Sequence, residues 1–282
     1  MQTVKMPHEI PGEALSSEAI TSRLPADLKG LRVYVFDRVR STNDTATALL
    51  KAEKEEPFLA VFAELQEGGR GRRGRSWSSP KGVGLLGTCA LAYPPGFASY
   101  PGEWPLLAAL AVRRAIASVT DLEVTIKWPN DLLIGGKKVC GILTEMIAVR
   151  DGCVCLAIGA GTNVNTELSL LPQEVQLRAT SLLAETGAMV NRNVLAAAIV
   201  SRLFDTYTET LRGLRFADQH KEMIAHCSTL GQHVRILQGQ TWIEGVAQTI
   251  DESGALHILL TDGTRQKLIS GEIVETYAIH SV

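Results

Sequence analysis

Residues 58–93, FLAVFAELQEGGRGRRGRSWSSPKGVGLLGTCALAY, contain the pattern that decides the fold. Two apolar runs, Phe58 to Leu65 and Val83 to Tyr93, have the composition of strands, and the Gly- and Arg-rich stretch from Gly68 to Arg75 has that of a loop. Residues 69–74 match G-x-G-x-x-G, a pattern typical of dinucleotide-binding folds. In those folds the glycines open a helix, and an acidic residue follows about 20 positions later. Here the loop leads into another strand and Tyr-Pro-Pro stands at that later position, so the sequence argues against a dinucleotide site.

The loop concentrates positive charge on a flexible backbone. Four arginines, Arg70, Arg72, Arg73 and Arg75, are interleaved with glycines. Fixed guanidinium charge on a backbone that can approach a ligand closely favours a polyanionic ligand. The alternative is a solvated charge run, although such runs seldom carry three glycines between two apolar strands. We expect the loop to be mobile until an anion orders it.

Further strands and helices are predicted on both sides of this stretch. Strands are expected at 31–36, 122–128, 138–149 and 154–160, and helices at 17–24, 46–54, 104–119, 181–185, 193–212 and 216–227. The side chains of Ser41-Thr42-Asn43-Asp44 suit the cap of the helix at 46–54. Together these segments predict an α/β (α+β) fold with a mixed, substantially antiparallel sheet.

The sequence pattern changes after residue 230, where apolar and polar residues alternate in short runs. Strands are expected there at 233–237, 241–250, 255–260 and 264–269. Asp262-Gly263 is the clearest hairpin signal among them. About 50 residues of this kind are typical of a small β-barrel. We therefore predict an N-terminal extension at 1–30, a catalytic α/β domain at 31–229 and a small C-terminal domain at 230–282.

Composition places limits on the function. The 282 residues are 45% hydrophobic and 21% charged with a net charge of -2, which is typical of a globular chain and not of a generally cationic nucleic-acid binder. Neither a membrane-spanning run nor a secretory signal is apparent, so we expect a cytoplasmic protein without membrane contact. The five cysteines lack a C-x-x-C pair and are interpreted as buried thiols, with Cys153 and Cys155 on one face of a strand.

Three further segments combine polar groups with turns or strand ends. They are Lys127-Trp128-Pro129-Asn130-Asp131, Lys137-Lys138-Val139-Cys140-Gly141-Ile142 and Gly159-Ala160-Gly161-Thr162-Asn163. Taken singly, each has an ordinary explanation, because Pro-Asn-Asp favours a turn and an edge lysine discourages strand pairing.

The order of these motifs along the chain resembles that of the biotin protein ligases. The resemblance runs from about residue 31 to residue 280 and includes Ser-Thr-Asn, Gln66 with the arginine loop and Trp77, Lys-Trp-Pro-Asn-Asp, Lys-x-x-Gly-Ile-Leu-x-Glu and Gly-x-Gly-x-Asn. It implies a catalytic domain related to class II aminoacyl-tRNA synthetases and an SH3-like C-terminal domain. It also implies a ligase that converts biotin and ATP into biotinyl-5'-AMP and pyrophosphate. The biotinyl group then passes to a lysine of a biotin carboxyl carrier protein or domain.

The resemblance also implies roles for individual residues. Biotin would be bound by Ser41, Thr42, Asn43, Gln66, Arg70, Gly71, Arg72, Lys138 and Gly141. ATP would be bound by Arg72, Arg73, Arg75, Trp77, Asn130 and Asn163. The catalytic set would be Arg70, Arg72, Lys138 and Asp131, with Asp131 orienting or deprotonating the incoming lysine. Mg²⁺ is expected with ATP, and the sequence shows no cluster of metal-binding side chains.

Two other interpretations are weighed against this one. A lipoate ligase would use the same acyl-adenylate chemistry, and a nucleic-acid-binding module would use the arginine loop on phosphate. The family's bacterial repressors carry a helix-turn-helix domain, and the 30 residues before Leu31 are too few for one, so we expect no specific DNA binding. A homodimer is compatible with the sequence.

Overall fold

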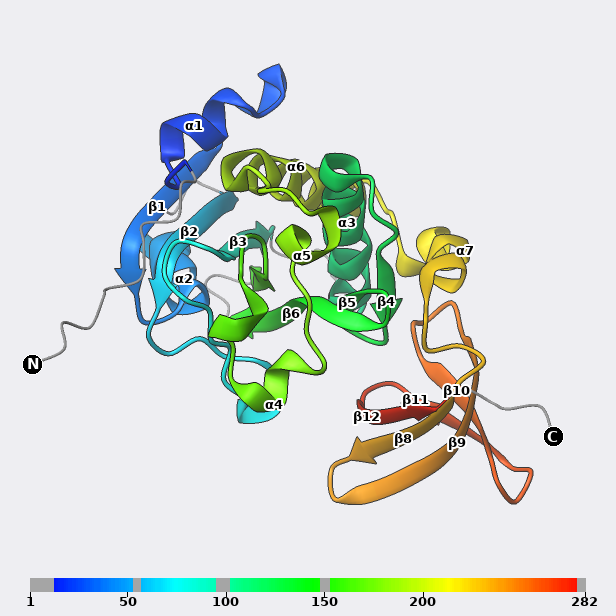
Figure 1. Ribbon diagram of the computed structural model, residues 1–282. Coiled ribbons are helices and arrows are strands. Elements are labelled where there is room, and N and C mark those ends of the chain that lie inside the picture. The colour runs from blue at the N-terminus through cyan, green and yellow to red at the C-terminus, as the bar shows by residue number, and fades with distance from the viewer. Residues whose placement is uncertain (1–12, 53–56, 95–101, 148–152, 278–282) are drawn as a thin grey trace, which may run out of the picture.

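The computed structural model describes residues 13–52, 57–94, 102–147 and 153–277 (Figure 1). A seven-stranded sheet forms its larger part, with strand order β1-β2-β3-β7-β6-β5-β4. The strands are β1 (Arg32–Val39), β2 (Phe58–Gln66), β3 (Leu85–Tyr93), β4 (Thr125–Lys127), β5 (Asp131–Ile134), β6 (Lys137–Ile147) and β7 (Val154–Thr162). Only the pair β1 and β2 is parallel among the pairs described. The predicted mixed, largely antiparallel sheet is confirmed.

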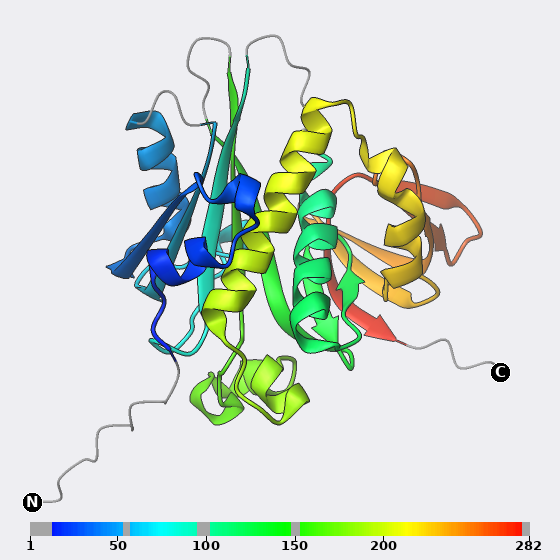
Figure 2. The same ribbon diagram turned by 90° about the horizontal axis from the view of Figure 1, so that it is seen from above.

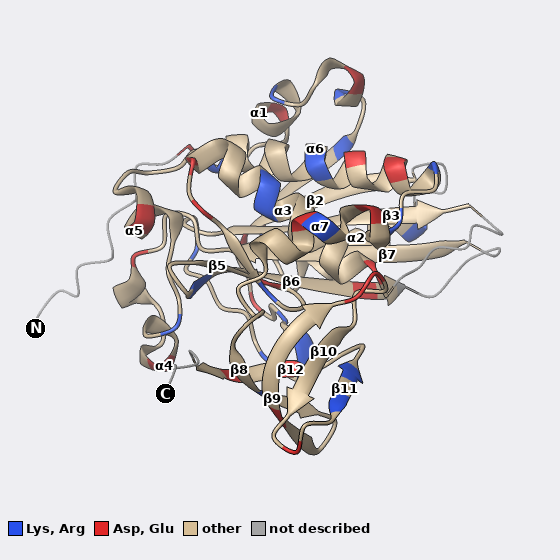
Figure 3. Ribbon diagram, turned by 90° about the vertical axis from the view of Figure 1, so that its right-hand side faces the viewer, with Lys and Arg blue, Asp and Glu red and all other residues tan. Residues whose placement is uncertain are grey.

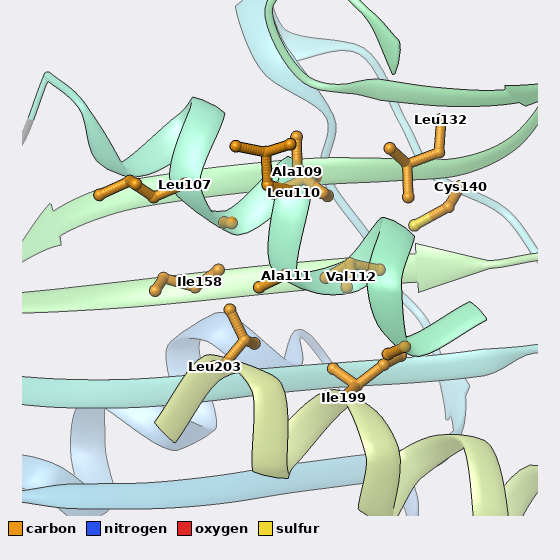
Figure 4. Packing of buried hydrophobic residues seen from close by; sticks show 14 of the residues in the cluster. Leu107, Ala109, Leu110, Ala111, Val112, Leu132, Cys140, Ile158, Ile199 and Leu203 are labelled. Atoms are coloured by element: carbon orange, nitrogen blue, oxygen red, sulfur yellow. The ribbon is translucent and has the colours of Figure 1, made fainter. Parts of the chain in front are cut away.

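Helices cover both faces of this sheet (Figure 2). Helix α2 (Thr42–Ala52) packs on one face, and α3 (Trp104–Thr120) and α6 (Arg192–Leu211) pack on the other. Figure 4 shows the core on the second face, where Ile199 and Leu203 of α6 and Ala111 of α3 lie over Ile158 of β7. The many alanines of α3 let it approach the sheet and α6 closely, because small side chains shorten the packing distance between helices.

Short elements complete the larger part. They are α1 (Ser17–Ser22), η1 (Ala26–Leu28), η2 (Arg72–Gly74), η3 (Leu168–Leu170), α4 (Gln173–Gln176) and α5 (Leu182–Thr186). A buried ion pair joins α6 to β2, because Arg192 donates to the carboxylate of Glu64 at 2.6 and 3.1 Å. The backbone amide of Leu15 donates to the same carboxylate at 2.8 Å, which attaches the N-terminal segment to the sheet. Both ion-pair partners are satisfied by these contacts, as a buried charge requires.

The C-terminal part is a second, antiparallel sheet of order β11-β10-β9-β8-β12 that follows α7 (Phe216–His226). Its strands are β8 (His233–Gln238), β9 (Thr241–Ile250), β10 (Leu256–Leu260), β11 (Arg265–Leu268) and β12 (Glu272–Tyr277). The predicted Asp262-Gly263 turn joins β10 to β11, with Gly263 at φ 83°. A positive φ of this kind is readily adopted by glycine.

Asp251 ties the end of β9 to β10 and β11. Its carboxylate accepts hydrogen bonds from the Ser253 amide and hydroxyl at 2.9 and 2.6 Å, and it lies 2.8 Å from both Nε2 of His257 and Nζ of Lys267. Burial alone would raise the pKa of Asp251, but the hydrogen bonds from His257, Lys267 and Ser253 outweigh it, so the pKa falls below the ordinary value of 3.8. The ionised carboxylate therefore stabilises this sheet.

The two sheets meet at Trp128, which is only 2% exposed. Its indole Nε1 donates to the carbonyl oxygen of Gly254 at 3.1 Å, and its backbone amide donates to the Thr229 hydroxyl at 3.0 Å. On α7, Nε2 of His220 lies 2.6 Å from the carbonyl oxygen of Ile250. The segment Lys-Trp-Pro-Asn-Asp is therefore also the segment against which the C-terminal sheet packs, through Trp128.

Several predicted boundaries were wrong. The helix predicted from Ala46 begins at Thr42, since the Thr45 amide already donates to the Ser41 carbonyl oxygen at 3.0 Å. The strand predicted at 122–128 is reduced to β4, and β5 and β12 were not predicted. The ends predicted at 53–54 and 148–149 lie outside the described residues.

The prediction of five buried thiols was also only partly right. All five cysteines are free, but Cys153 and Cys155 are half-buried. Cys153 directly precedes β7, so only Cys155 lies within that strand.

Candidate functional site

One cavity of about 740 Å³ lies at the start of α2, over β6 and β7, between the arginine loop and β12. It is lined by every residue to which the resemblance assigns a role: Ser41, Thr42, Asn43, Gln66, Arg70, Gly71, Arg72, Arg73, Arg75, Trp77, Asn130, Asp131, Lys138, Gly141 and Asn163. Motifs scattered over more than 120 positions of the chain therefore converge on one space. Their individual roles stay predictions.

One end of the cavity is polar, buried and built from uncharged groups. Ser41, Thr42 and Asn43 are 3 to 5% exposed at the start of α2. The amide and hydroxyl of Thr42 donate to Oε1 of Gln66 at 2.7 and 2.9 Å, and the Thr88 hydroxyl lies 2.8 Å from that of Thr42 and 2.6 Å from Oδ1 of Asn43. These contacts fix the Gln66 amide so that its nitrogen is left to donate elsewhere. Such a wall suits a neutral ligand with urea-like polar groups.

A chain of charged contacts closes the arginine loop over this end. Asn43 donates to Oε2 of Glu145 at 2.6 Å, and Arg70 lies 3.4 Å from the same oxygen. Arg70 also forms a bidentate pair with Asp44 at 2.7 and 2.9 Å. This hydrogen-bonded pair raises the pKa of Arg70 and lowers that of Asp44. The Arg70 charge is therefore already balanced by two carboxylates.

Two glycines of β7 explain the Gly-x-Gly motif. A side chain at Gly159 would overlap Oδ1 of Asn43 and would lie 3.2 Å from its Cγ. A side chain at Gly161 would lie 2.5 and 2.6 Å from Cε2 and Nε1 of Trp77. Both distances are below ordinary contact, so only glycine lets Asn43 and the indole lie flat against the strand.

Arg72 links the loop to the rest of the site. It donates to Oδ1 of Asn130 at 3.0 Å and to the carbonyl oxygen of Gly271 at 3.2 Å. Burial lowers the pKa of Arg72, and the charge of Arg73 adds to that effect, although a guanidinium stays protonated at neutral pH. Asn130 is held in place by its own hydrogen bond to the carbonyl oxygen of Ile142 at 2.8 Å.

The C-terminal sheet contributes a carboxylate that the sequence analysis missed. Glu272 at the start of β12 pairs with Arg75 and lies 3.8 Å from Arg73. It could not be found by spacing, because Glu272 is separated from the loop by about 200 positions. Thr88 and Glu145 were missed as well. Glu145 had a usable signal, since it lies four residues after Gly141 on the same face of β6.

Lys138 and Asp131 form an ion pair at 2.7 Å, with the Lys138 ammonium 5.5 Å from the centre of the Trp77 ring. The pairing of β5 with β6 sets Asp131 opposite Gly141. A side chain at Gly141 would lie 3.0 Å from both Lys138 and Trp77. Because Gly141 has no side chain, the Lys138 ammonium, the Asp131 carboxylate and the Trp77 indole can lie close together over the β5 and β6 strand pair.

Asn163 makes two hydrogen bonds to the backbone of neighbouring segments. Its side-chain nitrogen donates to the carbonyl oxygen of Thr180 at 3.0 Å, and its backbone amide donates to that of Val139 at 2.9 Å. Asn163 therefore holds the segment after α4 against β6 while it lines the cavity.

Two other features of the described residues bear on the class of protein. No group of three or more His, Cys, Asp or Glu side chains among them is placed to hold a metal ion. In the same residues, no helix has the length and apolarity needed to cross a membrane.

Comparison with known proteins decides the family. Residues 35–163 match the biotin/lipoate A/B protein ligase family, and residues 229–274 match the biotin protein ligase C-terminal domain. The bifunctional ligase/repressor BirA of Bacillus spizizenii is 31% identical over 93% of this chain and 79% of its own length. The chain belongs to the biotin protein ligase family.

Two further relatives agree with this assignment. The biotin acetyl-CoA-carboxylase ligase of Paracoccus denitrificans is 34% identical over 84% of this chain and 97% of its own. The biotin protein ligase of Aquifex aeolicus, solved with biotin and ATP, superposes with a TM-score of 0.71 at 28% identity, over 86% of this chain and 97% of that one. The ligase fold, with its second C-terminal sheet, is therefore confirmed. The match to a biotin-ligase C-terminal domain favours biotin over lipoate as the cofactor.

Proposed function

We propose that this protein is an ATP-dependent ligase that activates biotin as biotinyl-5'-AMP and transfers it to a lysine of a biotin carboxyl carrier protein or domain. The observation that carries the proposal is the convergence of all the family motifs on one cavity with a neutral end and a cationic end. The family match supports the same reaction.

The neutral end fits the biotin head group. Thr42, Asn43 and Gln66 offer uncharged donors and acceptors to the ureido ring. The hydrogen bonds from Thr42 to Gln66, and those of Asn43 with Glu145 and Thr88, fix their orientation before biotin binds. Preorganisation of this kind reduces the entropy lost on binding. The biotin carboxylate then extends along β6 toward Arg72 and Lys138.

Activation brings two anions together, the biotin carboxylate and the α-phosphate of ATP. Arg72 and Lys138 lie where their positive charges offset that repulsion and stabilise the charge that develops at phosphorus. Trp77 supplies a flat apolar surface for the adenine, and Asn130 and Asn163 supply amides beside it. The arginine loop, held by Arg70 and Arg72, shields the acyl-adenylate from water.

Transfer requires a neutral acceptor lysine. A free lysine with a pKa of about 10.4 is mostly protonated at neutral pH. Asp131 already holds the Lys138 ammonium at 2.7 Å, so the same carboxylate is suited to orient a second amine beside it. In that position it would accept the proton that the attacking amine loses.

Magnesium would arrive with ATP. The carboxylates of Asp131 and Glu272 are engaged by Lys138 and by the loop arginines, so the cavity forms no dedicated cage of oxygen ligands. Mg²⁺ commonly keeps most of its contacts with phosphates and water. It would neutralise part of the triphosphate charge at this site.

We further propose a cytoplasmic enzyme without specific DNA binding, able to form a homodimer. Five free cysteines fit a reducing compartment. Figure 3 shows Lys and Arg interspersed with Asp and Glu on α6 and α7, and the net charge of -2 gives no general attraction to nucleic acid. Salt-dependent DNA titration tests the second claim, and sedimentation with and without biotin and ATP tests the third.

The test of the proposed function is direct. The protein is incubated with ATP, biotin and a carrier domain, and the carrier is weighed by mass spectrometry. One biotinyl addition is expected, and none is expected on a carrier whose target lysine is arginine. Equal modification with lipoate in place of biotin, or no modification at all, would contradict the proposal.

A further inference from the structure

Lys127 is a half-buried cation that lines the cavity and has no assigned role. No carboxylate of the described residues lies within 4.0 Å of its ammonium, and burial lowers the pKa of Lys127. The nearest compensating charge is Asp131, which pairs with Lys127 across β4 and β5 but gives its carboxylate to Lys138. A partly desolvated ammonium without a counter-ion is an attractive site for an anionic ligand.

Arg178 stands beside Lys127. The segment 178–180 runs along the start of β6, because the Lys138 amide donates to the carbonyl oxygen of Arg178 at 2.8 Å and the Thr180 amide donates to that of Lys138 at 2.8 Å. The charges of Lys138, Arg178 and Arg75 all act on Lys127. Arg178 lines the cavity, and it too has no ion-pair partner in the part of the chain that the structure describes.

The loop arginines differ in this respect. Arg70 is paired with Asp44, and Arg73 and Arg75 face Glu272. An anion that bound them would first have to compete with these carboxylates. Lys127 and Arg178 hold their charge free of such competition among the described residues.

The position of the pair fits the far end of a long ligand. The Lys138 ammonium lies beside Gly141 of β6, four residues before Glu145, so the cationic part of the cavity and the part beside Asn43 and Glu145 are separated by about 13 Å along the strand. A ligand chain that starts with biotin at Asn43 passes Arg72 and Lys138 before it reaches Lys127 and Arg178.

We infer that Lys127 and Arg178 bind the β- and γ-phosphates of ATP and retain the pyrophosphate as it leaves. This inference rests on the proposed function. When a carboxylate oxygen of biotin attacks the α-phosphorus, a new P–O bond forms, and the bond from that phosphorus to the oxygen bridging to the β-phosphate breaks. The bridging oxygen leaves with pyrophosphate and keeps the bonding electron pair. The growing negative charge is then met by two cations that form no ion pair within 4.0 Å with a carboxylate of the described residues.

Binding measurements on the full chain test the inference. The variants are Lys127→Gln and Arg178→Gln, and the control is Lys137→Gln, an exposed lysine of the same hairpin that does not line the cavity. Each variant is titrated with ATP, inorganic pyrophosphate, AMP and biotin. We expect each of the two variants to lose about tenfold in affinity for ATP and pyrophosphate, the value of one charge-assisted hydrogen bond, with AMP and biotin binding unchanged. The control should match the wild type for all four ligands.

The outcomes separate this inference from the proposed function. Unchanged pyrophosphate affinity in both variants overturns the inference, even if the wild type biotinylates a carrier. Equal losses for AMP and ATP also overturn it, because AMP lacks the two phosphates. Weaker binding of the carrier domain in the variants, with ATP and pyrophosphate binding unchanged, would also overturn the inference, and would assign Lys127 and Arg178 to the protein substrate instead. If the wild type shows no biotin-dependent chemistry but its pyrophosphate binding falls in the variants, the proposed function fails and the phosphate site stands.

Discussion

Gly159→Ala should disable the biotin end of the cavity while the fold is kept. The new methyl group would overlap Oδ1 of Asn43 and would lie 3.2 and 3.4 Å from its Cγ and Nδ2. Asn43 is buried beneath the start of α2, so its amide has to shift by about 1 Å to reach ordinary van der Waals contact. That shift would break its bond to Glu145 at 2.6 Å and its contact with Thr88 at 2.6 Å.

The magnitude follows from these two interactions. The bond to the Glu145 carboxylate is worth about 1.5 to 3 kcal/mol and the neutral contact with Thr88 about 1 kcal/mol. If the loss of the Asn43 contact with biotin costs about 2 kcal/mol, the Kd for biotin rises by roughly thirtyfold. Loss of both bonds would cost about 2.5 to 4 kcal/mol of stability and would lower Tm by roughly 5 to 10 °C in a chain of this size.

The assay is calorimetric titration with biotin, accompanied by thermal unfolding. The control is Gly30→Ala, because a side chain at that exposed glycine would contact nothing within 4 Å. The control should bind biotin as the wild type does. Wild-type biotin affinity in Gly159→Ala would refute the placement of Asn43 against β7 and its role in binding.

Three other predictions follow from the same geometry. Gly161→Ala should push the Trp77 indole off β7 and weaken ATP binding by roughly tenfold, with biotin affinity kept; titration with each ligand checks it. Arg72→Gly should remove the bonds of the loop to Asn130 and Gly271 and speed release of biotinyl-AMP, measured as adenylate recovered after gel filtration; normal retention would count against this role. Asp251→Asn should cost about 1 to 2 kcal/mol of unfolding free energy at pH 7. Because the folded-state pKa of Asp251 is lowered, the wild type's advantage is fully present well above the ordinary pKa of 3.8 and is lost only as the pH falls through the lowered folded-state value; denaturant unfolding from pH 7 down to the lowest pH at which the protein stays folded measures it.

Local pattern was enough to predict much of the main sheet, and all the residues to which the resemblance assigned a role line the cavity, although Glu272, Lys127 and Arg178 line it too and were not named. The strand predicted at Phe58 to Leu65 is β2, and the strand predicted at Val83 to Tyr93 contains β3. Those runs are long and almost continuously apolar, as expected of strands that are buried on both faces. The cavity residues were named from the resemblance to the biotin protein ligases, which rests on compact motifs of unusual composition.

Contacts between distant segments left no such signal. Strand β12 was missed although Ile273, Val274, Thr276 and Tyr277 favour a strand, because it is short and its partner β8 lies far back in the chain. The same distance along the chain hid the contact of Glu272 with Arg75, and Thr88 was not distinguished from an ordinary strand threonine. Asp131 to Ile134 was not predicted as a strand, because four residues give too little alternation to identify one.

The central claim is that this cavity joins biotin to the α-phosphate of ATP. Exchange of labelled pyrophosphate into ATP measures that step without a carrier protein, because only reversal of adenylate formation returns pyrophosphate to ATP. The account predicts exchange that requires biotin and is lost in Arg72→Gly or Lys138→Gln. Exchange that is independent of biotin, or equally supported by lipoate, would contradict it.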